Sequence, residues 1–318
     1  MPSSRAPAPG AFAGAILAAG EGRRIQPFSG FVPKPLLPLL DRPLLVWQVE
    51  RLAELGIRQV AIVIGHRGER IRATLGDGAA LGARIEYVVQ KELLGIAHAV
   101  GCLEGVVDRP FLLLLGDVFF ESDRMGEMLA LHGAEGARAV IAVREEADDA
   151  ALRRNFAVET AAGGWVRRVE EKPVRPRTRC KGTGQYVLDE SIFAAVRRTP
   201  RSPLRGEQEL TDALQVLIDS GSRVRAADVI RSDLNLSTPG DLLRLNLEEL
   251  ARRGLANWVA PEAAVDPGAS LHRSIVLAGA RIAAGARLER SLVMPGEHVG
   301  PGEYRDLVLV EGQGIGGD

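Results

Sequence analysis

Two glycines and two cations that follow the first apolar run of this chain have the types and spacing to perform chemistry. The stretch GAILAAGEGRRIQPFSGFVPKPLLPLL, residues 14–40, places Gly20, Gly22, Arg24 and Lys34 directly after apolar residues. Backbone N–H groups of a glycine-rich loop bind phosphate oxygens, and Arg and Lys side chains neutralise their charge. The pattern therefore indicates a loop that wraps a triphosphate, with Arg24 and Lys34 as its cations.

Two other kinds of glycine loop do not match this stretch. A dinucleotide-binding fingerprint, G-x-G-x-x-G, needs a third glycine where this chain has Ile25. A P-loop needs a Gly-Lys pair followed by Ser or Thr, whereas the first lysine here is Lys34 and a proline follows it. The triphosphate-wrapping loop is the interpretation that remains.

The use of lysine is unusual. The chain has 40 basic residues, and four of them are lysines, Lys34, Lys91, Lys172 and Lys181. Arginine offers a planar fork and lysine a compact point charge. Each lysine therefore marks a candidate site that needs a point charge.

Composition excludes several classes of protein. The 318 residues are 46% apolar and 25% charged, with a net charge of −1, so we expect a folded protein without a nucleic-acid-binding surface. Cys102 and Cys180 are far apart in sequence and suggest a reduced, cytoplasmic protein. The first residues faintly resemble a signal peptide, but Gly10 and Gly14 break the apolar run, and we expect residues 1–10 to form a flexible tail. No run approaches the roughly 18 apolar residues of a membrane span, and we expect no membrane partner.

Apolar strands and amphipathic helices alternate from residue 11 to about residue 229. We expect strands at 13–20, 59–65, 84–90, 110–117 and 137–145, and helices at 43–56 and 95–105. Continuous apolar strands separated by helices are typical of a Rossmann-like, mostly parallel sheet between helices. Residues 165–173 and 180–189 suggest an additional strand layer, and 208–221 and 238–254 suggest helices, the last capped by Thr238.

The sequence changes character after Ala260. Residues 263–279 align with 280–296, so that Val265 matches Ile282 and Leu271 matches Leu288. A near-hexapeptide apolar period with Gly and Pro corners indicates a short left-handed parallel β-helix, although a β-hairpin meander is an alternative. The expected domains are a tail at 1–10, a catalytic domain at 11–256 and the β-helix at 257–318. Exposed rungs or sheet faces favour a homo-oligomer.

Several segments resemble the sugar-1-phosphate nucleotidyltransferases, also called nucleotide-sugar pyrophosphorylases. Arg23, Ile25 and Ile96 stand where that family usually has Thr or Ser, Leu or Met, and Thr or Leu. The segments are LAAGEGRRIQPFSGFVPKPLLPL, QKELLGIAHAV (90–100), LLLLGDVFF (112–120), VEEKP (169–173) and SDLNLSTPGDLLRLN (232–246). The β-helix tail is similar to that of the longer members, and the best likeness is to glucose-1-phosphate thymidylyl- and uridylyltransferases.

The resemblance implies a reaction between a nucleoside triphosphate and a sugar-1-phosphate that releases pyrophosphate. The attacking phosphate has a second pKa of about 6, so it is mostly ionised at neutral pH and needs no general base. The reaction instead needs alignment and charge neutralisation, by cations and by Mg²⁺. The motif LAAG favours UTP or dTTP, and the likeness favours glucose-1-phosphate.

The resemblance also assigns roles to individual residues. Asn235 stands where the family has its second metal-binding Asp, and Asp233 is an alternative ligand. Asp117 could instead cap the turn after its strand, and Glu171 with Lys172 could be an ordinary exposed ion pair. The implied sites are nucleotide-binding Leu17, Ala18, Ala19, Gly20, Gly22, Gln90 (which would read the base edge) and Gly95 (which would let the chain approach the base); catalytic Arg24 and Lys34; sugar-phosphate-binding Gly116, Glu171, Lys172 and Gly184; and metal-binding Asp117 and Asn235.

Three rival functions remain. One is a non-catalytic, sugar-nucleotide-binding regulatory subunit with the same fold, and another is specificity of the mannose-1-phosphate guanylyltransferase type. A third is an acyltransferase whose β-helix carries the active site, which would need a longer coil and a catalytic histidine such as His272 or His298. The presence of Arg24, Lys34 and Asp117 argues against the regulatory subunit. The two to three legible coils argue against the acyltransferase, and the motif LAAG favours a pyrimidine nucleotide over GTP.

Overall fold

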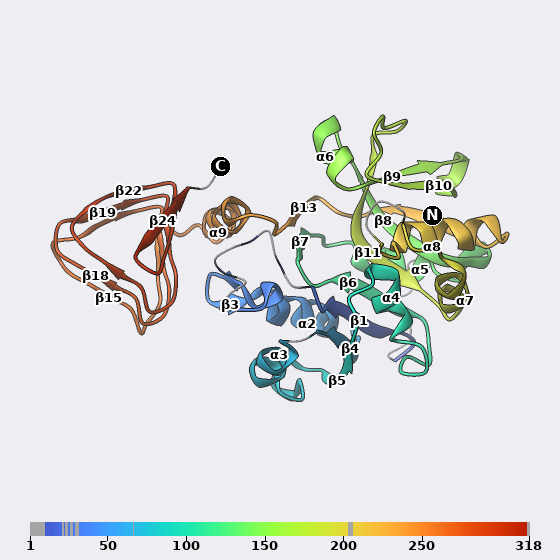
Figure 1. Cartoon of the computed structure of the whole chain (residues 1–318), viewed down its shortest axis with the longest axis horizontal. Helices are drawn as coiled ribbons and strands as arrows, with labels where there is room; N and C mark the ends of the chain where they lie inside the picture. Colours follow the sequence, from blue (N-terminus) through green and yellow to red (C-terminus); the bar gives the residue numbers. More distant parts are fainter. Residues whose placement is uncertain are drawn as a thin grey trace. The chain divides into compact units, whose positions relative to one another are not determined.

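Two compact units divide the chain. The computed structural model describes residues 10–20, 22, 25, 28, 32–65, 67–202 and 206–316. One unit contains Met1–Glu21 and Gln48–Asp233, and the other contains Gly22–Trp47 and Leu234–Asp318. Figure 1 labels the elements of each unit.

The described part of the first unit is built on a nine-stranded sheet. Its order is β10-β9-β11-β6-β1-β4-β5, and β8 pairs with both β11 and β12. The strands are β1 (Ala13–Ala18), β4 (Gln59–Ile64), β5 (Arg84–Val89), β6 (Phe111–Leu115), β8 (Ala137–Glu145), β9 (Phe156–Thr160), β10 (Val166–Glu171), β11 (Cys180–Leu188) and β12 (Arg223–Asp228).

The parallel part of this sheet confirms the expected mixed α/β fold. Strand β1 pairs in parallel with β6 on one side and β4 on the other, and β4 pairs in parallel with β5. The central residues of β6 and β4 are buried, as expected for strands that are covered on both faces. Because β4 and β5 follow β1 on one side and β6 returns on the other, the strand order reverses between β1 and β6. Open α/β sheets bind ligands at the carboxyl edge of such a reversal.

The expected additional strand layer at 165–173 and 180–189 is wrong. These residues form β10 and β11, which belong to the same sheet as β1. Strand β11 is antiparallel to both β6 and β8, and nearly every residue of it is buried. A nine-residue strand that is buried on both faces packs best inside the sheet, whereas the short hairpin of β9 and β10 continues its edge.

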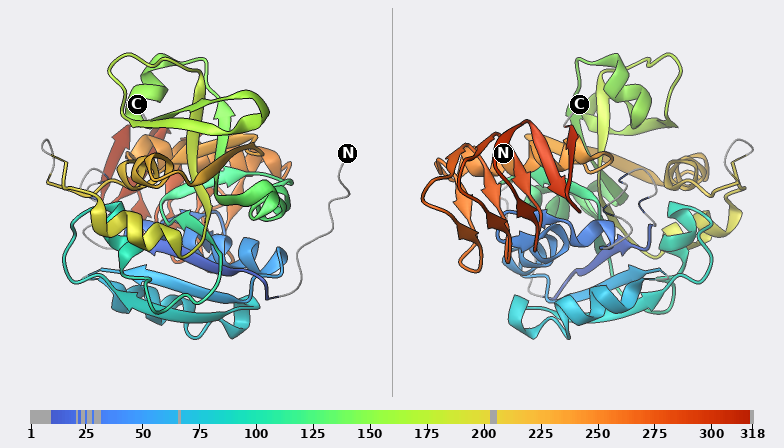
Figure 2. Two further views of the ribbon diagram at one scale, coloured as in Figure 1. Left: turned by 90° about the vertical axis from the view of Figure 1, so that its right-hand side faces the viewer. Right: turned by 60° about the vertical axis from the view of Figure 1, so that its left-hand side comes forward.

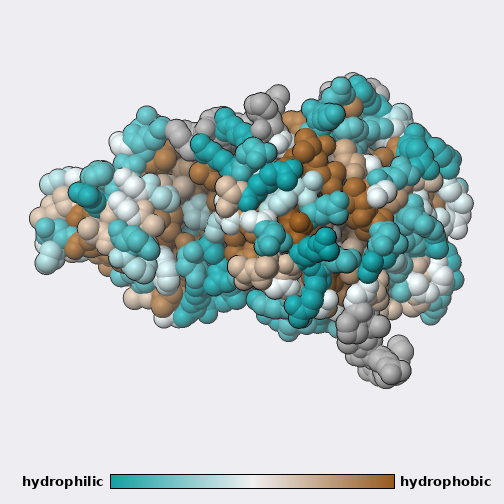
Figure 3. All heavy atoms as spheres, turned by 90° about the horizontal axis from the view of Figure 1, so that it is seen from below, coloured by the Kyte–Doolittle hydropathy of each residue, from teal (hydrophilic) through white to brown (hydrophobic). Residues whose placement is uncertain are grey.

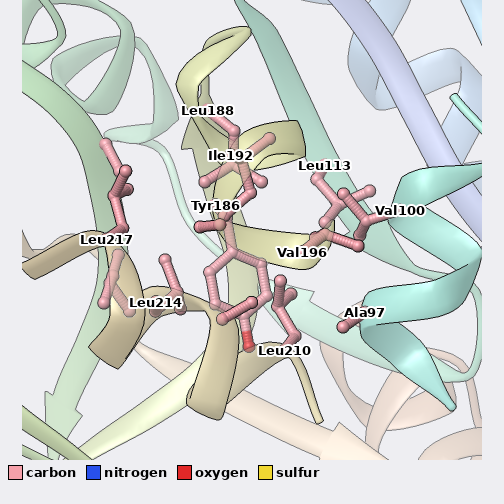
Figure 4. Packing of buried hydrophobic residues seen from close by; sticks show 14 of the residues in the cluster. Ala97, Val100, Leu113, Tyr186, Leu188, Ile192, Val196, Leu210, Leu214 and Leu217 are labelled. Carbon is pink, nitrogen blue, oxygen red and sulfur yellow. The ribbon is translucent and has the colours of Figure 1, made fainter. Parts of the chain in front are cut away.

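Helices pack on the sheet around a buried apolar cluster. Figure 4 shows Tyr186 of β11 beside Leu210 and Leu214 of α8 and Val196 of α7. The elements that complete this unit are α2 (Leu44–Glu54, which starts in the other unit), α3 (Gly68–Leu75), α4 (Ile96–Gly101), α5 (Met125–Leu131), α6 (Asp149–Arg154), α7 (Ser191–Arg198), α8 (Leu210–Asp219), β7 (Val118–Glu121), β13 (Ser232–Asn235, at the border of the units) and 3₁₀ turns at Ala79–Leu81, Ala134–Gly136 and Ala162–Gly164.

The second unit contains a parallel β-helix, visible as stacked rungs in Figure 2. Its registers confirm the predicted 17-residue repeat, because Val265 pairs with Ile282 and Leu271 pairs with Leu288. The strands are β14 (Trp258–Val259), β15 (Ala264–Val265), β16 (Ser270–His272), β17 (Ile275–Val276), β18 (Arg281–Ile282), β19 (Ala286–Glu289), β20 (Leu292–Val293), β21 (His298–Val299), β22 (Gly302–Arg305), β23 (Leu307–Val310) and β24 (Gln313–Gly316), the last antiparallel to β23.

A ladder of small polar side chains joins successive rungs at one corner of the coil. The Asn257 side-chain oxygen accepts a hydrogen bond from the Ser274 backbone N–H at 2.9 Å, and Ser274 Oγ accepts one from the Ser291 N–H at 3.2 Å. Ser291 Oγ accepts from the Leu307 N–H at 3.3 Å. Each side chain therefore satisfies a backbone donor that the corner takes out of the strand ladder.

Helix α9 (Pro239–Arg252) packs on strand β23 and on the short hairpin of β2 (Pro38–Leu39) and β3 (Arg42–Pro43). The Asn246 side chain accepts a hydrogen bond from the Leu40 N–H at 2.8 Å and donates one to the Pro38 carbonyl at 2.9 Å. A capping box of Thr238 and Asp241 starts α9, as the sequence suggested for Thr238. These contacts place α9 with the β-helix, so the compact units differ from the expected domains, which met at residue 256.

Hydrophilic and hydrophobic residues are interspersed on the face in Figure 3. Among the described residues, no helix is both long and apolar enough to cross a membrane.

Candidate functional site

The carboxyl ends of β4, β1 and β6 lie in close backbone contact. A Cβ atom on Gly116, directly after β6, would lie 2.6 Å from the Leu17 carbonyl oxygen. A Cβ atom on Gly65, directly after β4, would lie 2.5 Å from the Ala19 carbonyl oxygen. The Gly116 N–H also donates to Leu17 O at 2.9 Å, which locks the two strand ends together. Only glycine fits at Gly65 and Gly116, and the edge beside Gly20 stays open to a ligand.

Sequence reasoning did not single out Gly65. It found Gly116 through a motif, but the need for glycine at the end of β4 depends on the register between β4 and β1. Its signal was the ending VIG of an apolar strand, which is common in proteins and weak by itself. The predicted residues Leu17, Ala18, Ala19 and Gly20 lie on this same edge.

Asp117 follows Gly116 at this edge and its side chain is partly exposed. Its position at the point where the strand order reverses suits a residue that meets a ligand. A carboxylate at a strand end is the kind of oxygen ligand that Mg²⁺ accepts from a protein when phosphates supply further oxygens. Among the described residues, no group of three or more His, Cys, Asp and Glu side chains is arranged to hold a metal ion. A metal at Asp117 would therefore depend on amide, water or substrate oxygens.

Gln90 and Gly95 flank the loop between β5 and α4. The Gln90 N–H donates to Ile64 O at 2.9 Å, which places Gln90 just beyond the carboxyl end of the parallel strands. Gly95 has φ of +110°, and a Cβ there would lie 2.4 Å from the Gln208 carbonyl oxygen. The chain therefore needs Gly95 for packing against Gln208, a reason that the sequence did not reveal. Its predicted contact with a base stays a prediction.

Three large apolar side chains remain exposed around Gln90 and Gly95. Val89, Leu93 and Ile96 are 52%, 40% and 38% exposed. All three belong to the segment 89–96 that contains Gln90 and Gly95.

Glu171 ends strand β10, Lys172 follows it, and their side chains form an ion pair of 3.3 Å. The Thr211 hydroxyl donates to Glu171 at 3.3 Å, which joins this pair to the start of α8. Lys172 has φ of +43°, a left-handed conformation that costs of order 1 kcal/mol for a lysine and is concentrated at functional sites. Six other described residues that are not glycine also have a positive φ, so this backbone is compatible with an ordinary ion pair as well.

Gly184 and Tyr186 of β11 belong to the same unit as Glu171 and Lys172. Gly184 of β11 has φ of +90°, and a Cβ there would lie 3.1 Å from a Leu115 methyl group, so the strand passes close to the end of β6. Burial raises the pKa of Tyr186, and the Glu171 carboxylate raises it further, so this phenol stays neutral.

The carboxylate of Asp233 is fully engaged in the first unit. Lys181 Nζ donates to both of its oxygens at 2.8 Å, and Arg144 Nε donates to one of them at 2.6 Å. Lys181 is 3% exposed and Arg144 is partly exposed, so one buried and one half-buried cation compete with any metal for this carboxylate. This arrangement argues against Asp233 as the alternative metal ligand and leaves Asn235 as the candidate.

The remaining predicted residues belong to the second unit or lie outside the described residues. Lys34 begins a 3₁₀ turn, Lys34–Leu36, and is 8% exposed. Gly22 has φ of +66° and accepts a hydrogen bond from the Ile25 N–H at 3.0 Å. Asn235, at the end of β13, is exposed. Arg24 lies outside the described residues, so its role stays a prediction.

Comparison with known proteins shows the family and the fold of this chain. A family model described as nucleotidyl transferase matches residues 13–238. A glucose-1-phosphate thymidylyltransferase of Streptomyces griseus is 32% identical over 73% of this chain and 64% of its own length. The UTP–glucose-1-phosphate uridylyltransferase AglF of Haloferax volcanii is 33% identical over 71% of this chain and 91% of its own length. A solved UDP-glucose pyrophosphorylase, 22% identical, covers 76% of this chain and 100% of its own with a TM-score of 0.67, which supports the fold.

Proposed function

This chain belongs to the nucleotidyl transferase family, and we propose that it joins a nucleoside triphosphate, UTP or dTTP, to a sugar-1-phosphate, with glucose-1-phosphate favoured. An oxygen of the sugar phosphate attacks the α-phosphorus of the triphosphate. The bond from that phosphorus to the oxygen bridging to the β-phosphate breaks, and pyrophosphate leaves with the electron pair. No proton transfer is required, because the attacking phosphate is already ionised near neutral pH.

The observation that carries this proposal is the main-chain edge at the ends of β4, β1 and β6. Gly65 and Gly116 allow the ends of β4 and β6 to pack closely on the backbone of β1, and Asp117 follows Gly116 at once. A phosphate chain needs close approach to backbone amides and a carboxylate that can hold a divalent ion. The carboxyl edge at a reversal of strand order is also where sheets of this kind bind nucleotides.

The surrounding residues have the chemistry that the two substrates require. Val89, Leu93 and Ile96 offer an apolar surface to the base, and Gln90 offers a hydrogen-bonding edge. Glu171 would accept from sugar hydroxyls, and Lys172 would neutralise the sugar phosphate. Arg24 and Lys34 would neutralise the triphosphate and the departing pyrophosphate, which is the main requirement of a reaction without a general base.

Asp117 and Asn235 are the residues we propose for Mg²⁺. Both offer oxygen atoms, the ligand type that Mg²⁺ prefers, and an amide oxygen binds it more weakly than a carboxylate. When bound, the ion would draw charge from the phosphate oxygens. We place this activity in the cytoplasm, which is consistent with the two free thiols of Cys102 and Cys180.

The test is a substrate panel that measures pyrophosphate release. UTP, dTTP, CTP, ATP and GTP are each combined with glucose-1-phosphate and other sugar-1-phosphates, with Mg²⁺ and with EDTA. Asp117→Asn is expected to lose at least about 100-fold in kcat while its circular dichroism is unchanged. Asp123→Asn is the matched control, because Asp123 is exposed and pairs only with exposed Arg231 among the described residues.

Two outcomes would contradict the proposal. Folded protein that releases no pyrophosphate with any pair of substrates is not a nucleotidyltransferase. If such a protein still binds a nucleotide sugar, the regulatory subunit becomes the better assignment. Equal activity of Asp117→Asn and Asp123→Asn would remove Asp117 from the site.

A further inference from the structure

The side-chain amide of Gln90 is held from one side only. Gln90 is 4% exposed, and its amide nitrogen lies 2.9 Å from His98 Nδ1 and 3.4 Å from the Gly95 carbonyl oxygen. Within the described part of the chain, its amide oxygen accepts no hydrogen bond. The amide therefore turns its nitrogen toward α4 and leaves its oxygen as an unused acceptor.

Gly95 and His98 determine the orientation of the Gln90 side-chain amide. A backbone carbonyl can only accept, so the group that faces Gly95 must be the NH₂ group of Gln90. His98 Nδ1 then has to accept as well, which puts the proton of the neutral imidazole on Nε2. The contact to His98, at 2.9 Å, is the shorter and stronger of the two.

We propose that His98 is a positioning residue that sets the base specificity of this enzyme through Gln90, an inference that rests on the proposed function. With its nitrogen held by His98, Gln90 presents an oxygen to the base. Uracil and thymine carry an N–H donor at N3, whereas cytosine carries an acceptor there. The Gln90 amide, held in this orientation, therefore selects uracil or thymine against cytosine. Without this contact, the amide could rotate by about 180° and donate from its NH₂ group to N3 of cytosine.

The surroundings of His98 allow this to be tested by substitution. His98 is half-buried and lines a surface hollow of about 290 Å³ together with Cys102, Phe193 and Val196. Side chains of similar size therefore have room at this position. His98→Asn keeps an acceptor oxygen close to the place of Nδ1, whereas His98→Leu keeps the bulk and removes the acceptor.

The experiment compares UTP with CTP, and dTTP with dCTP, in the wild type and both variants. The readouts are kcat/KM for pyrophosphate release and the dissociation constants from isothermal titration. For His98→Leu, we expect the preference for UTP over CTP to fall about tenfold, the value of one hydrogen bond to a buried partner, with kcat for UTP changed less than about threefold. For His98→Asn, the preference should stay within about threefold of wild type.

The outcomes separate this inference from the proposed function. An unchanged UTP preference in His98→Leu, at unchanged melting temperature, would overturn the positioning role. Equal losses in His98→Leu and His98→Asn would show that packing and not the acceptor matters, which would also overturn it. If the wild type releases no pyrophosphate, the proposed function fails, and the ratio of the two dissociation constants still decides the role of His98.

Discussion

A single methyl group at Gly116 should disable the main-chain edge on which the proposed activity depends. Alanine at this position would place its Cβ 2.6 Å from the Leu17 carbonyl oxygen and 3.3 Å from Ala18 Cα. Both of these atoms are backbone of β1, so no side chain can rotate away. The ends of β1 and β6 would have to separate, although the hydrogen bond from the Gly116 N–H to Leu17 O holds them together.

The size of the effect follows from the distances. Carbon and oxygen atoms in contact lie about 3.3–3.6 Å apart, so relief requires a shift of about 0.7–1 Å. Overpacking of this kind costs about 1–3 kcal/mol of folding stability. Because Asp117 is the next residue, the shift moves the proposed metal ligand by a similar distance. A displacement of about 1 Å lowers the rate of an aligned reaction by about 100-fold.

The assay pairs Gly116→Ala with Gly126→Ala. Gly126 lies in α5, and a Cβ there would meet no heavy atom within 4 Å. Gly126→Ala should keep full activity and gain about 0.5–1 kcal/mol, because alanine favours the helix. Pyrophosphate release and urea denaturation are measured on both proteins, at a temperature where both are folded. Gly116→Ala with activity within twofold of wild type would refute the reasoning about this edge.

Two further predictions concern stability. Lys181→Met should lower the free energy of unfolding by about 3 kcal/mol, because the buried Asp233 carboxylate loses the ammonium group that contacts both of its oxygens. Urea denaturation measures this loss, and a value below about 0.5 kcal/mol would contradict the prediction. Burial opposes ionisation of Asp189, but the His132 ring, whose Nε2 lies 3.6 Å away, two hydrogen bonds from Ser191 and the Arg138 guanidinium outweigh it and lower the pKa below 3.8. The contribution of Asp189 to stability is therefore complete above about pH 4 and is lost as the pH falls through the folded pKa. Asp189→Asn should therefore be less stable at pH 7 yet lose less stability than wild type between pH 5 and pH 3, as measured by urea denaturation at each pH.

The sequence predicts best where one physical cause decides the structure. Strands β1, β4 and β6 are continuous apolar runs of the length of a buried strand, and the structure has them where they were expected. The β-helix follows from a repeat that a reader can align by eye, and its registers match that alignment. In both cases the burial of apolar side chains drives the local structure, and burial leaves a visible period in the sequence.

The sequence predicts poorly where two distant segments decide the structure together. Strand β11 was expected in an additional layer, because its pairing with β8 and β6 depends on segments about 40 and 70 residues away, respectively. The need for glycine at Gly95 comes from the backbone of Gln208, which no local pattern reveals. The same holds for the two cations on Asp233, which come from β8 and β11.

The candidate site is built partly from backbone and partly from side chains. This difference explains which of its residues could be predicted from the sequence and which could not. Glycines at the ends of β4 and β6 allow close backbone packing on β1, and their need is set by strand register. Charged side chains, Asp117, Glu171 and Lys172, lie at strand ends, where motifs can be recognised from sequence. A reaction between two phosphates requires just these parts, close approach to amides and neutralised charge, and does not require a base with a shifted pKa. Function can therefore be inferred from the motif residues. The alignment of the two reacting phosphates depends in addition on glycines such as Gly65, whose need becomes clear only from the pairing of the strands.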